Sequence, residues 1–227
     1  MIPLARRAER LLLRLSSQLW QQRRHNRLAL EQVAGYELVI LPEVMNPRIF
    51  RSGEYFSSVL SDNLIAPHSH VLDMGSGSGI VALVAARWAS RVLAVDINPA
   101  AVRCTGINVL LNGLEERVEV RESDLFSAVQ RERFDLVLFN PPYFRGQAQP
   151  GFEQAWRSED TVERFAMQLR DYLKPNGSAL LVLSTDGDAA AFLRVFAEQG
   201  YCHNTIASRR LLAETLTVHH FWLHGKE

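Results

Sequence analysis

The sequence predicts an α/β fold, in which a mainly parallel sheet carries helices on both faces. From His70 onward, short apolar segments alternate with longer segments whose apolar residues recur at three- and four-residue steps. This alternation is typical of parallel strands, because the chain must cross over the sheet between one strand and the next. The last two predicted strands have no helix between them, which favours an antiparallel pair at the end of the chain.

The chain is expected to have two parts, a basic helical extension over 1–35 and an α/β domain over 36–227. Leucines and alanines at helical spacing predict a helix over 4–30, with Gly35 after it. The strands are expected at 36–41, 70–74, 91–96, 118–121, 134–139, 178–184, 201–207 and 215–223, with an irregular stretch at 42–52. The helices are expected at 80–88, 99–112, 160–173 and 188–199, with Asn98 as the N-cap and Pro99 as the first helical residue of the second.

The net charge of zero conceals two oppositely charged parts. Seven arginines and one acid give residues 1–27 a net charge of +6, and the remaining 200 residues carry −6. This basic segment is either a solvated helix face, a binding surface or an organellar transit peptide. No apolar run is long enough for a membrane span, and two distant cysteines favour a reducing, cytoplasmic location. The seven histidines lack further ligands at metal-site spacing, so no metal is expected.

Chemically distinctive residues follow the first two strands of the predicted parallel sheet. The first strand ends in Asp73 and a turn with Gly75, Gly77 and Gly79, which allows a close backbone approach to a ligand. Alternatively, these glycines serve only to pack a helix on the strand. Asp96 ends the second strand, where a carboxylate can accept hydrogen bonds from both ribose hydroxyls of an adenosine. NAD and S-adenosylmethionine both present such a ribose, so Asp96 indicates a nucleoside without choosing between them.

The next two strand ends narrow the choice. Asp124 follows the third strand and can meet an adenine amino group or cap a short helix. The fourth strand ends in Asn140-Pro141-Pro142-Tyr143, where two prolines fix a turn and end the ladder. The side-chain carbonyl of Asn140 and the backbone carbonyl of Pro141 can accept both hydrogens of a planar amino group, while Tyr143 packs on its face. These residues favour chemistry at a planar nitrogen.

Together these segments resemble the class I S-adenosylmethionine-dependent methyltransferases, most closely the HemK-type glutamine N5-methyltransferases with an NPPY motif. The resemblance covers about residues 36–200 and implies a Rossmann-like, seven-stranded, mainly parallel sheet with an antiparallel last strand. It implies S-adenosylmethionine as cofactor, with the glycine turn at its methionine part, Asp96 at the ribose and Asp124 at the adenine. The expected cofactor-binding residues are Ser52, Glu54, Asp73, Gly75, Ser76, Gly77, Gly79, Asp96, Ile97, Asn98, Asp124, Leu125 and Asn140, and the expected catalytic residues are Asn140, Pro141, Pro142 and Tyr143.

The chain departs from the HemK pattern in the parts that would face a substrate. Residues 48–56 match the upstream HemK segment loosely, and residues 144–156 do not follow the release-factor pattern after NPPY. The first expectation for the acceptor is therefore a protein glutamine side chain, with two alternatives. These are a base amino group of RNA (adenine N6 or guanine N2) and a small molecule; a non-catalytic cofactor-binding protein is least favoured. Whether the chain is a monomer or a dimer stays open.

Overall fold

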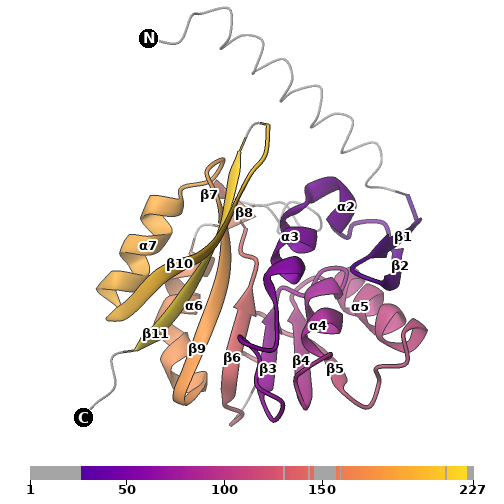
Figure 1. Ribbon diagram of the computed structural model, residues 1–227, viewed down its shortest axis with the longest axis horizontal. Coiled ribbons are helices and arrows are strands. Elements are labelled where there is room, and N and C mark those ends of the chain that lie inside the picture. Colours follow the sequence, from indigo (N-terminus) through magenta and orange to yellow (C-terminus); the bar gives the residue numbers. More distant parts are fainter. Residues whose placement is uncertain are drawn as a thin grey trace, which may run out of the picture.

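The computed structural model describes residues 27–129, 131–142, 144–145, 157–158, 160–212 and 214–223, of which 144–145 and 157–158 are described by their backbone alone. Most of the predicted helix over 4–30 lies outside these residues, as do Tyr143 and most of the loop that follows it. Figure 1 shows one twisted sheet flanked by helices on both faces.

Seven strands form the main sheet, in the order β10-β11-β9-β6-β3-β4-β5. They are β3 (His70–Met74), β4 (Arg91–Asp96), β5 (Val118–Glu122), β6 (Phe134–Phe139), β9 (Leu173–Ser184), β10 (Tyr201–Arg210) and β11 (Thr215–Leu223). Strand β11 is antiparallel to both its neighbours, and β5, β4, β3, β6 and β9 are mutually parallel. The predicted fold class is therefore confirmed, including the antiparallel last strand.

Six helices and two short pairs of strands complete the described structure. The helices are α2 (Pro47–Phe50), α3 (Ser52–Val59), α4 (Ile80–Ala85), α5 (Pro99–Leu111), α6 (Thr161–Tyr172) and α7 (Ala189–Glu198). The pairs are β1 (Ala29–Val33) with β2 (Tyr36–Ile40), antiparallel, and β7 (Phe144–Arg145) with β8 (Arg157–Ser158), parallel.

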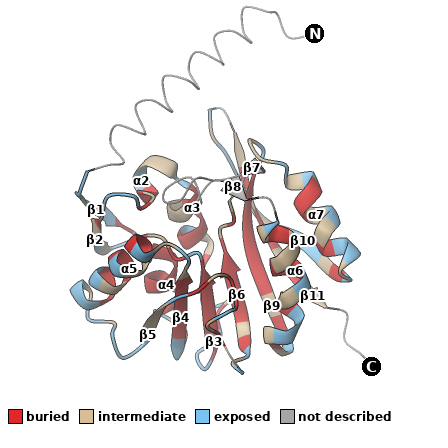
Figure 2. Cartoon of the chain, turned by 180° about the vertical axis from the view of Figure 1, so that it is seen from behind, coloured by how far each residue is buried: buried red, intermediate tan, exposed pale blue. Residues whose placement is uncertain are grey.

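Two apolar layers enclose the sheet, as the red central strands of Figure 2 show. One layer packs α3, α4, α5 and the β1–β2 hairpin on one face, and it includes the fully buried Phe56 and Leu83. The other packs α6 and α7 on the opposite face through Phe165 and Phe196. Burial of both faces explains why the central strands read as continuous apolar runs instead of alternating ones.

The connections place a crevice at one edge of the sheet. After β3 the chain crosses to β4 on one side, and β6 lies on the other side of β3. In open α/β sheets, ligands bind beyond the carboxyl ends of the strands where the order reverses in this way. The carboxyl ends of β3, β4 and β6 are therefore the place to look for a site.

Several element boundaries differ from those predicted. Residues 29–30 begin strand β1 and do not end a helix, and the turn at Gly35 joins β1 to β2. The stretch over 42–52, predicted to be irregular, contains α2, because Asn46 caps it and Pro47 occupies its first turn. Helix α5 begins at Pro99 as predicted, with the Asn98 side chain accepting from the Ala100 N–H at 2.9 Å.

The described residues contain no helix that is both long enough and apolar enough to cross a membrane. They also contain no group of three or more His, Cys, Asp or Glu side chains placed to hold a metal ion.

Candidate active site

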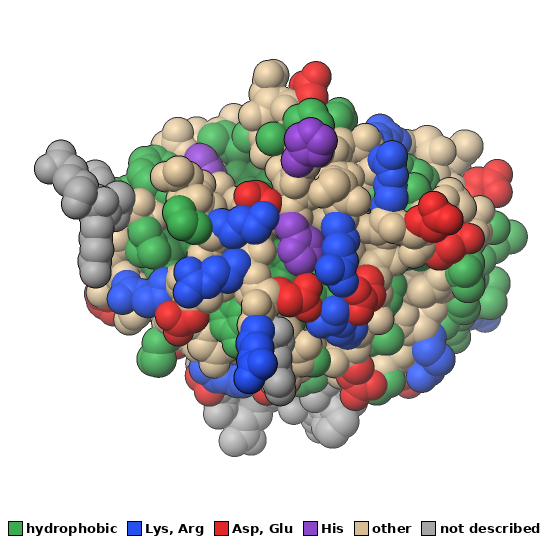
Figure 3. All heavy atoms as spheres, turned by 90° about the horizontal axis from the view of Figure 1, so that it is seen from below, with side chains coloured by type: hydrophobic (Ala, Val, Ile, Leu, Met, Phe, Trp, Pro, Cys, Tyr) green, Lys and Arg blue, Asp and Glu red, His purple; other side chains and the backbone are tan. Residues whose placement is uncertain are grey.

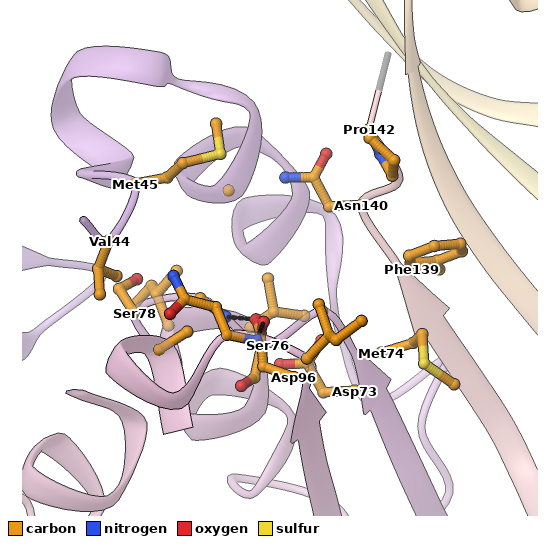
Figure 4. Close-up of a pocket in the computed structure, with 18 of the residues that line it drawn as sticks. Val44, Met45, Asp73, Met74, Ser76, Ser78, Asp96, Phe139, Asn140 and Pro142 are labelled. Atoms are coloured by element: carbon orange, nitrogen blue, oxygen red, sulfur yellow. Dashed lines mark hydrogen bonds between the residues drawn. The ribbon is translucent and has the colours of Figure 1, made fainter. Parts of the chain in front are cut away.

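A pocket opens at the carboxyl ends of β3, β4 and β6, with about 1130 Å³ of space that is partly open to solvent. Figure 4 shows Asp73 and Asp96 on one side of it and Asn140 and Pro142 on another. The predicted site residues that line it are Ser52, Asp73, Gly75, Ser76, Gly77, Asp96, Ile97, Asn98, Asp124, Leu125, Asn140 and Pro142.

The glycine-rich turn after β3 is held in place by α5. Gly75, Gly77 and Gly79 have φ values of 69°, 57° and 83°, a region that side chains rarely adopt. The Thr105 hydroxyl on α5 donates to the carbonyl oxygen of Gly77 at 3.1 Å and lies 3.1 Å from the Ser76 hydroxyl. These contacts fix the path of the turn, so its shape exists before any ligand binds.

Two glycines of this turn have different functions. A Cβ on Gly79 would lie 2.9 Å from Cγ2 of Thr105, closer than side chains approach, so Gly79 is needed for packing against α5. Gly79 does not line the pocket. A Cβ on Gly77 would come no nearer than 4.0 Å to other heavy atoms, and Gly77 does line the pocket. The packing role proposed as an alternative for the glycines therefore applies to Gly79.

Asp73 is a buried carboxyl group at the end of β3. Its side chain is 2% exposed, and Oδ2 has no hydrogen-bond partner within the described part of the chain. Burial raises its pKa to about 8, with the nearby Asp96 charge adding to the rise and the Ala82 N–H opposing it. A buried carboxylate of this kind is stabilised by a cation. The pocket therefore favours a positively charged ligand group next to Asp73.

The carboxylate of Asp96 accepts hydrogen bonds from the backbone of two segments that line the pocket. Its Oδ2 accepts the Gly77 N–H at 2.8 Å and its Oδ1 accepts the Asn98 N–H at 2.9 Å. Burial still raises the pKa of Asp96, because these two bonds offset only part of the desolvation. Each carboxylate oxygen has a second lone pair, so both can also accept a hydroxyl group from the pocket.

Asp124 lies beside a cation that the sequence did not reveal. Arg164 on α6 donates through Nη2 to Oδ2 of Asp124 at 2.7 Å, and this pairing raises the pKa of Arg164. Leu125, which is buried, and Ile97, which is exposed, also line the pocket. Arg164 was missed because it stands forty positions away from Asp124 and on an ordinary amphipathic helix.

Asn140 leaves the end of β6 and reaches toward α3. Its Nδ2 donates to the hydroxyl of Ser52 at 3.1 Å, and Ser52 is 2% exposed. This bond connects the amide of Asn140 to the N-terminus of α3. Pro142 also lines the pocket, Pro141 is buried next to it, and Tyr143 lies outside the described residues.

Of the two upstream residues, the structure brings only Ser52 to the pocket. Glu54 does not line it and pairs with Arg48 at 2.7 Å. Two residues along a helix turn the side chain through about 200°, so Ser52 and Glu54 face opposite ways on α3. The pocket residues that were not predicted as site residues include Glu43, Val44, Met45, Pro47, Phe50 and Thr161. The signal available for the α2 residues was Asn46-Pro47, a helix start that was interpreted as a loop.

The chain matches the family model described as methyltransferase small domain over residues 49–205. The chain belongs to this methyltransferase family. The matched region contains the glycine turn, Asp96, Asp124 and the Asn140 turn.

Individual relatives agree with this assignment. A Methanocaldococcus jannaschii protein, provisionally named a protein N5-glutamine methyltransferase, is 30% identical over 68% of this chain and 79% of its own length. A Porphyromonas gingivalis tRNA1(Val) (adenine(37)-N6)-methyltransferase is 30% identical over 66% of this chain and 61% of its own length. The predicted resemblance to glutamine N5-methyltransferases and related N-methyltransferases is confirmed.

The fold is shared with solved methyltransferases. A Thermus thermophilus 16S rRNA N2 guanine methyltransferase, solved with S-adenosylmethionine and guanosine, has a TM-score of 0.63 at 22% identity. The match covers 85% of this chain and 49% of that one, so this methyltransferase spans about half the length of that relative.

S-adenosylmethionine, the cofactor of this family, fits the residues of the pocket. It carries a sulfonium and an ammonium group, and Asp73 is a buried carboxyl with an unpartnered oxygen. It carries a ribose, and Asp96 lines the pocket with Oδ2 bound to the Gly77 N–H of the glycine turn and Oδ1 bound to the Asn98 N–H after β4. The chain is an S-adenosylmethionine-dependent N-methyltransferase.

Proposed function

We propose that this enzyme transfers the methyl group of S-adenosylmethionine to a planar amide or amino nitrogen held by Asn140. The observation that carries the proposal is the placement of Asn140. It stands at the end of β6 on the wall of the pocket, with its amide oriented by the buried hydroxyl of Ser52. A fixed carbonyl acceptor beside a cation-binding pocket suits a nitrogen whose N–H groups must be held in one direction.

The protein contributes orientation to this reaction. A planar nitrogen is a weak nucleophile because its lone pair is delocalised. The carbonyls of Asn140 and Pro141 are proposed to accept its two N–H bonds and direct the lone pair at the methyl carbon. Such positioning can supply much of the rate, since a bound near-attack geometry replaces a bimolecular encounter.

Bonds and protons balance without a general base. The bound cofactor supplies an electrophilic methyl group, whose bond to sulfur breaks as the bond to nitrogen forms. The methylated nitrogen then carries an acidic proton, which water can accept. No ionisable side chain is therefore required at the acceptor, and the residues proposed for this position are an amide, two prolines and a tyrosine.

Two macromolecular acceptors present such a nitrogen. A protein glutamine side chain, the first expectation from the sequence, is supported by the name of the M. jannaschii relative. A base amino group is supported by the name of the P. gingivalis relative and by the arginines described below. A small-molecule amine or amide is a third candidate, and no described residue specifically favours it.

The test is a labelling experiment with fractionated acceptors. The enzyme is incubated with methyl-labelled S-adenosylmethionine and with separate protein, RNA and small-molecule fractions of a cell extract. We expect label in at least one fraction at alkali-stable N-methyl groups, and no label with heat-inactivated enzyme. If the enzyme binds the cofactor and labels none of the fractions, the proposed transfer is wrong.

A further inference from the structure

Three exposed arginines stand toward the carboxyl edge of the sheet, in two separate parts of the chain. Arg51 lies between α2 and α3, and Arg209 and Arg210 end strand β10. All three are exposed, and none forms an ion pair with any acidic side chain that the structure describes. We call Arg51, Arg209 and Arg210 the arginine rim.

Arg51 borders the pocket directly. The residues on either side of it, Phe50 and Ser52, both line the pocket. Its backbone has a φ of 56°, which ends α2 and begins α3 in a new direction. Because the Ser52 hydroxyl accepts the hydrogen bond from Nδ2 of Asn140, the rim begins one residue from the side of the pocket proposed to hold the acceptor.

The β10–β11 hairpin brings the other two arginines to the same edge. The guanidinium of Arg209 lies over the ring of Tyr55 on α3, 5.9 Å from its centre. The turn beyond it is closed by the Leu211 N–H, which donates to the carbonyl oxygen of Glu214 at 2.8 Å. Figure 1 shows the tip of this hairpin rising beyond the carboxyl edge of the sheet.

The neighbouring acids are engaged elsewhere. Glu54 on α3 pairs with Arg48, and Glu214 at the hairpin accepts from the hydroxyl of Ser184. A guanidinium that lies over an aromatic ring keeps the N–H groups in its own plane available, so Arg209 can still donate hydrogen bonds to a ligand. The rim therefore presents positive charge that the described structure does not neutralise.

We propose that the arginine rim binds the phosphate backbone of an RNA whose base is the methyl acceptor. The inference rests on the proposed transfer to a planar nitrogen and names its substrate class. Arginine forks match phosphate oxygens, and 23 of the 25 basic residues of this chain are arginine. Cations on both α3 and the hairpin can hold the backbone on two sides while a base enters toward Asn140.

The charge distribution of the whole chain favours RNA over an acidic protein. Six further arginines occur within residues 1–26, just ahead of Arg27 and β1. A repeating polyanion can engage many separate cations at once, whereas a glutamine-bearing protein loop needs few. Base amino groups also satisfy the requirement for a planar nitrogen.

The experiment compares two triple variants with equal loss of charge. The rim variant is Arg51→Gln, Arg209→Gln and Arg210→Gln. The control is Arg103→Gln on α5, Arg131→Gln before β6 and Arg194→Gln on α7, three other arginines that are exposed and make no described ion pair. Arg131 is a matched control for Arg51 because both have a positive φ, of 63° and 56°, so the two substitutions carry similar backbone strain. Binding of fluorescently labelled bulk tRNA is followed over about 50 to 200 mM salt.

We expect the wild type and the control to bind with steep salt dependence, and the rim variant to lose about one unit of the log–log slope per arginine. Methyl transfer into the tRNA should fall with the binding, while affinity for S-adenosylmethionine stays the same in all three proteins. An equal loss of tRNA binding in the control variant would show a general effect of charge and would contradict the proposed role of the arginine rim.

Failure of this inference is distinguishable from failure of the proposed function. Label in protein that the rim variant leaves unchanged overturns the RNA assignment and retains the transfer. Label in protein that the rim variant abolishes identifies an acidic protein as the partner, and it also overturns the RNA assignment. Absence of label in every fraction, with cofactor bound, overturns the proposed function itself.

Discussion

The two edges of the main sheet differ in how completely their charged side chains are paired. At the amino edge, where β3, β4 and β6 begin, cations and anions are paired with each other: Arg91 with Glu119, Arg121 with Glu132, and Lys174 with Asp135. Figure 3, which views the molecule from below, shows acidic and basic side chains interspersed around histidines. At the carboxyl edge, Asp124 pairs with Arg164 and Glu54 with Arg48, but other charged groups there are not paired. Asp73 is buried without a partner for Oδ2, and the arginine rim has no ion pair within the described residues.

This difference teaches where the molecule is complete and where it is prepared for a ligand. Paired surface charges contribute little to stability and leave nothing for a partner to neutralise. Ionising a buried carboxyl such as Asp73 costs free energy, which a bound cation recovers, and exposed unpaired arginines remain available to an anion. The carboxyl edge therefore has the properties of a binding site, while the amino edge serves the fold.

The largest expected effect is the loss of catalysis when Asn140 at the carboxyl edge is replaced. Asn140→Ala should lower kcat by roughly two to three orders of magnitude, because it removes a preorganised polar contact to the acceptor. Cofactor affinity should stay within about threefold, since Asp73 and Asp96 are untouched. Single-turnover methylation and cofactor titration measure the two quantities.

The matched control for this change is Asn204→Ala, which truncates an exposed asparagine on β10. It should leave turnover unchanged. If Asn140→Ala turns over as fast as wild type, the assignment of the NPPY turn to the acceptor is wrong.

The sequence was sufficient to predict the main sheet and the site residues that stand at the ends of its strands. Strands β3, β4 and β6 were predicted with the observed bounds, because burial on both faces makes their sequences continuously apolar. Asp73, Asp96 and Asn140 could be found because parallel strands end at one edge, so position in the chain already implies proximity.

The remainder of the site depends on contacts that sequence spacing does not encode. Arg164 reaches Asp124 across forty residues, and Ser52 reaches Asn140 across 88. Both contacts depend on where α6 and α3 pack. The periodicity of apolar residues predicts a helix, but it does not say where on the sheet that helix lies. Helix α2 was missed because prolines suggest a loop unless the capping residue before them is weighed. The reversed orientation of Glu54 likewise requires the helix α3 to be known.

The second prediction uses the buried carboxyl group of Asp73, whose Oδ2 has no hydrogen-bond partner among the described residues. Its pKa is raised from an ordinary 3.8 to about 8, so it is largely protonated near pH 7 in the free enzyme. A cationic cofactor favours the ionised form, and binding should therefore release a proton. Below about pH 8 the affinity should rise with pH, by at most about tenfold per unit. Calorimetry in buffers of different ionisation enthalpy counts the proton.

The sign for folding stability follows from the same shift. A raised pKa means that the stabilising contribution of Asp73 is present below about pH 4 and is lost as the pH rises toward 8. Asp73→Asn should flatten this dependence and remove the proton release that belongs to Asp73, leaving only that of the ligand's own amino group. Unchanged proton release in Asp73→Asn would contradict the assigned role.

The third prediction compares Gly79, the N-cap of α4, with Gly113, which follows the C-terminus of α5. Gly79 and Gly113 both have positive φ, of 83° and 63°, but an added Cβ meets Thr105 at 2.9 Å at Gly79 and nothing within 4 Å at Gly113. Gly113→Ala should cost about 1 kcal/mol from backbone strain alone. Gly79→Ala should cost about 1–3 kcal/mol more, because the packed interior must shift. Urea denaturation measures both, and equal costs would remove the packing argument.

The smallest expected effect lies at the amino edge. Asp135 accepts both the Lys174 ammonium and the His70 N–H at 2.7 Å, and although burial acts to raise its pKa, these two partners lower it overall. Its contribution to stability is therefore present at neutral pH and is lost as the pH falls below about 4, opposite in sign to Asp73. Because the side chains of Lys174 and Asp135 are each 39% exposed, solvent screens the pair. Lys174→Gln should lower the free energy of unfolding by less than about 1 kcal/mol and leave cofactor affinity and turnover unchanged.

A large loss of cofactor affinity or of turnover in Lys174→Gln would show that the amino edge also serves catalysis, and the contrast between the two edges would then be wrong.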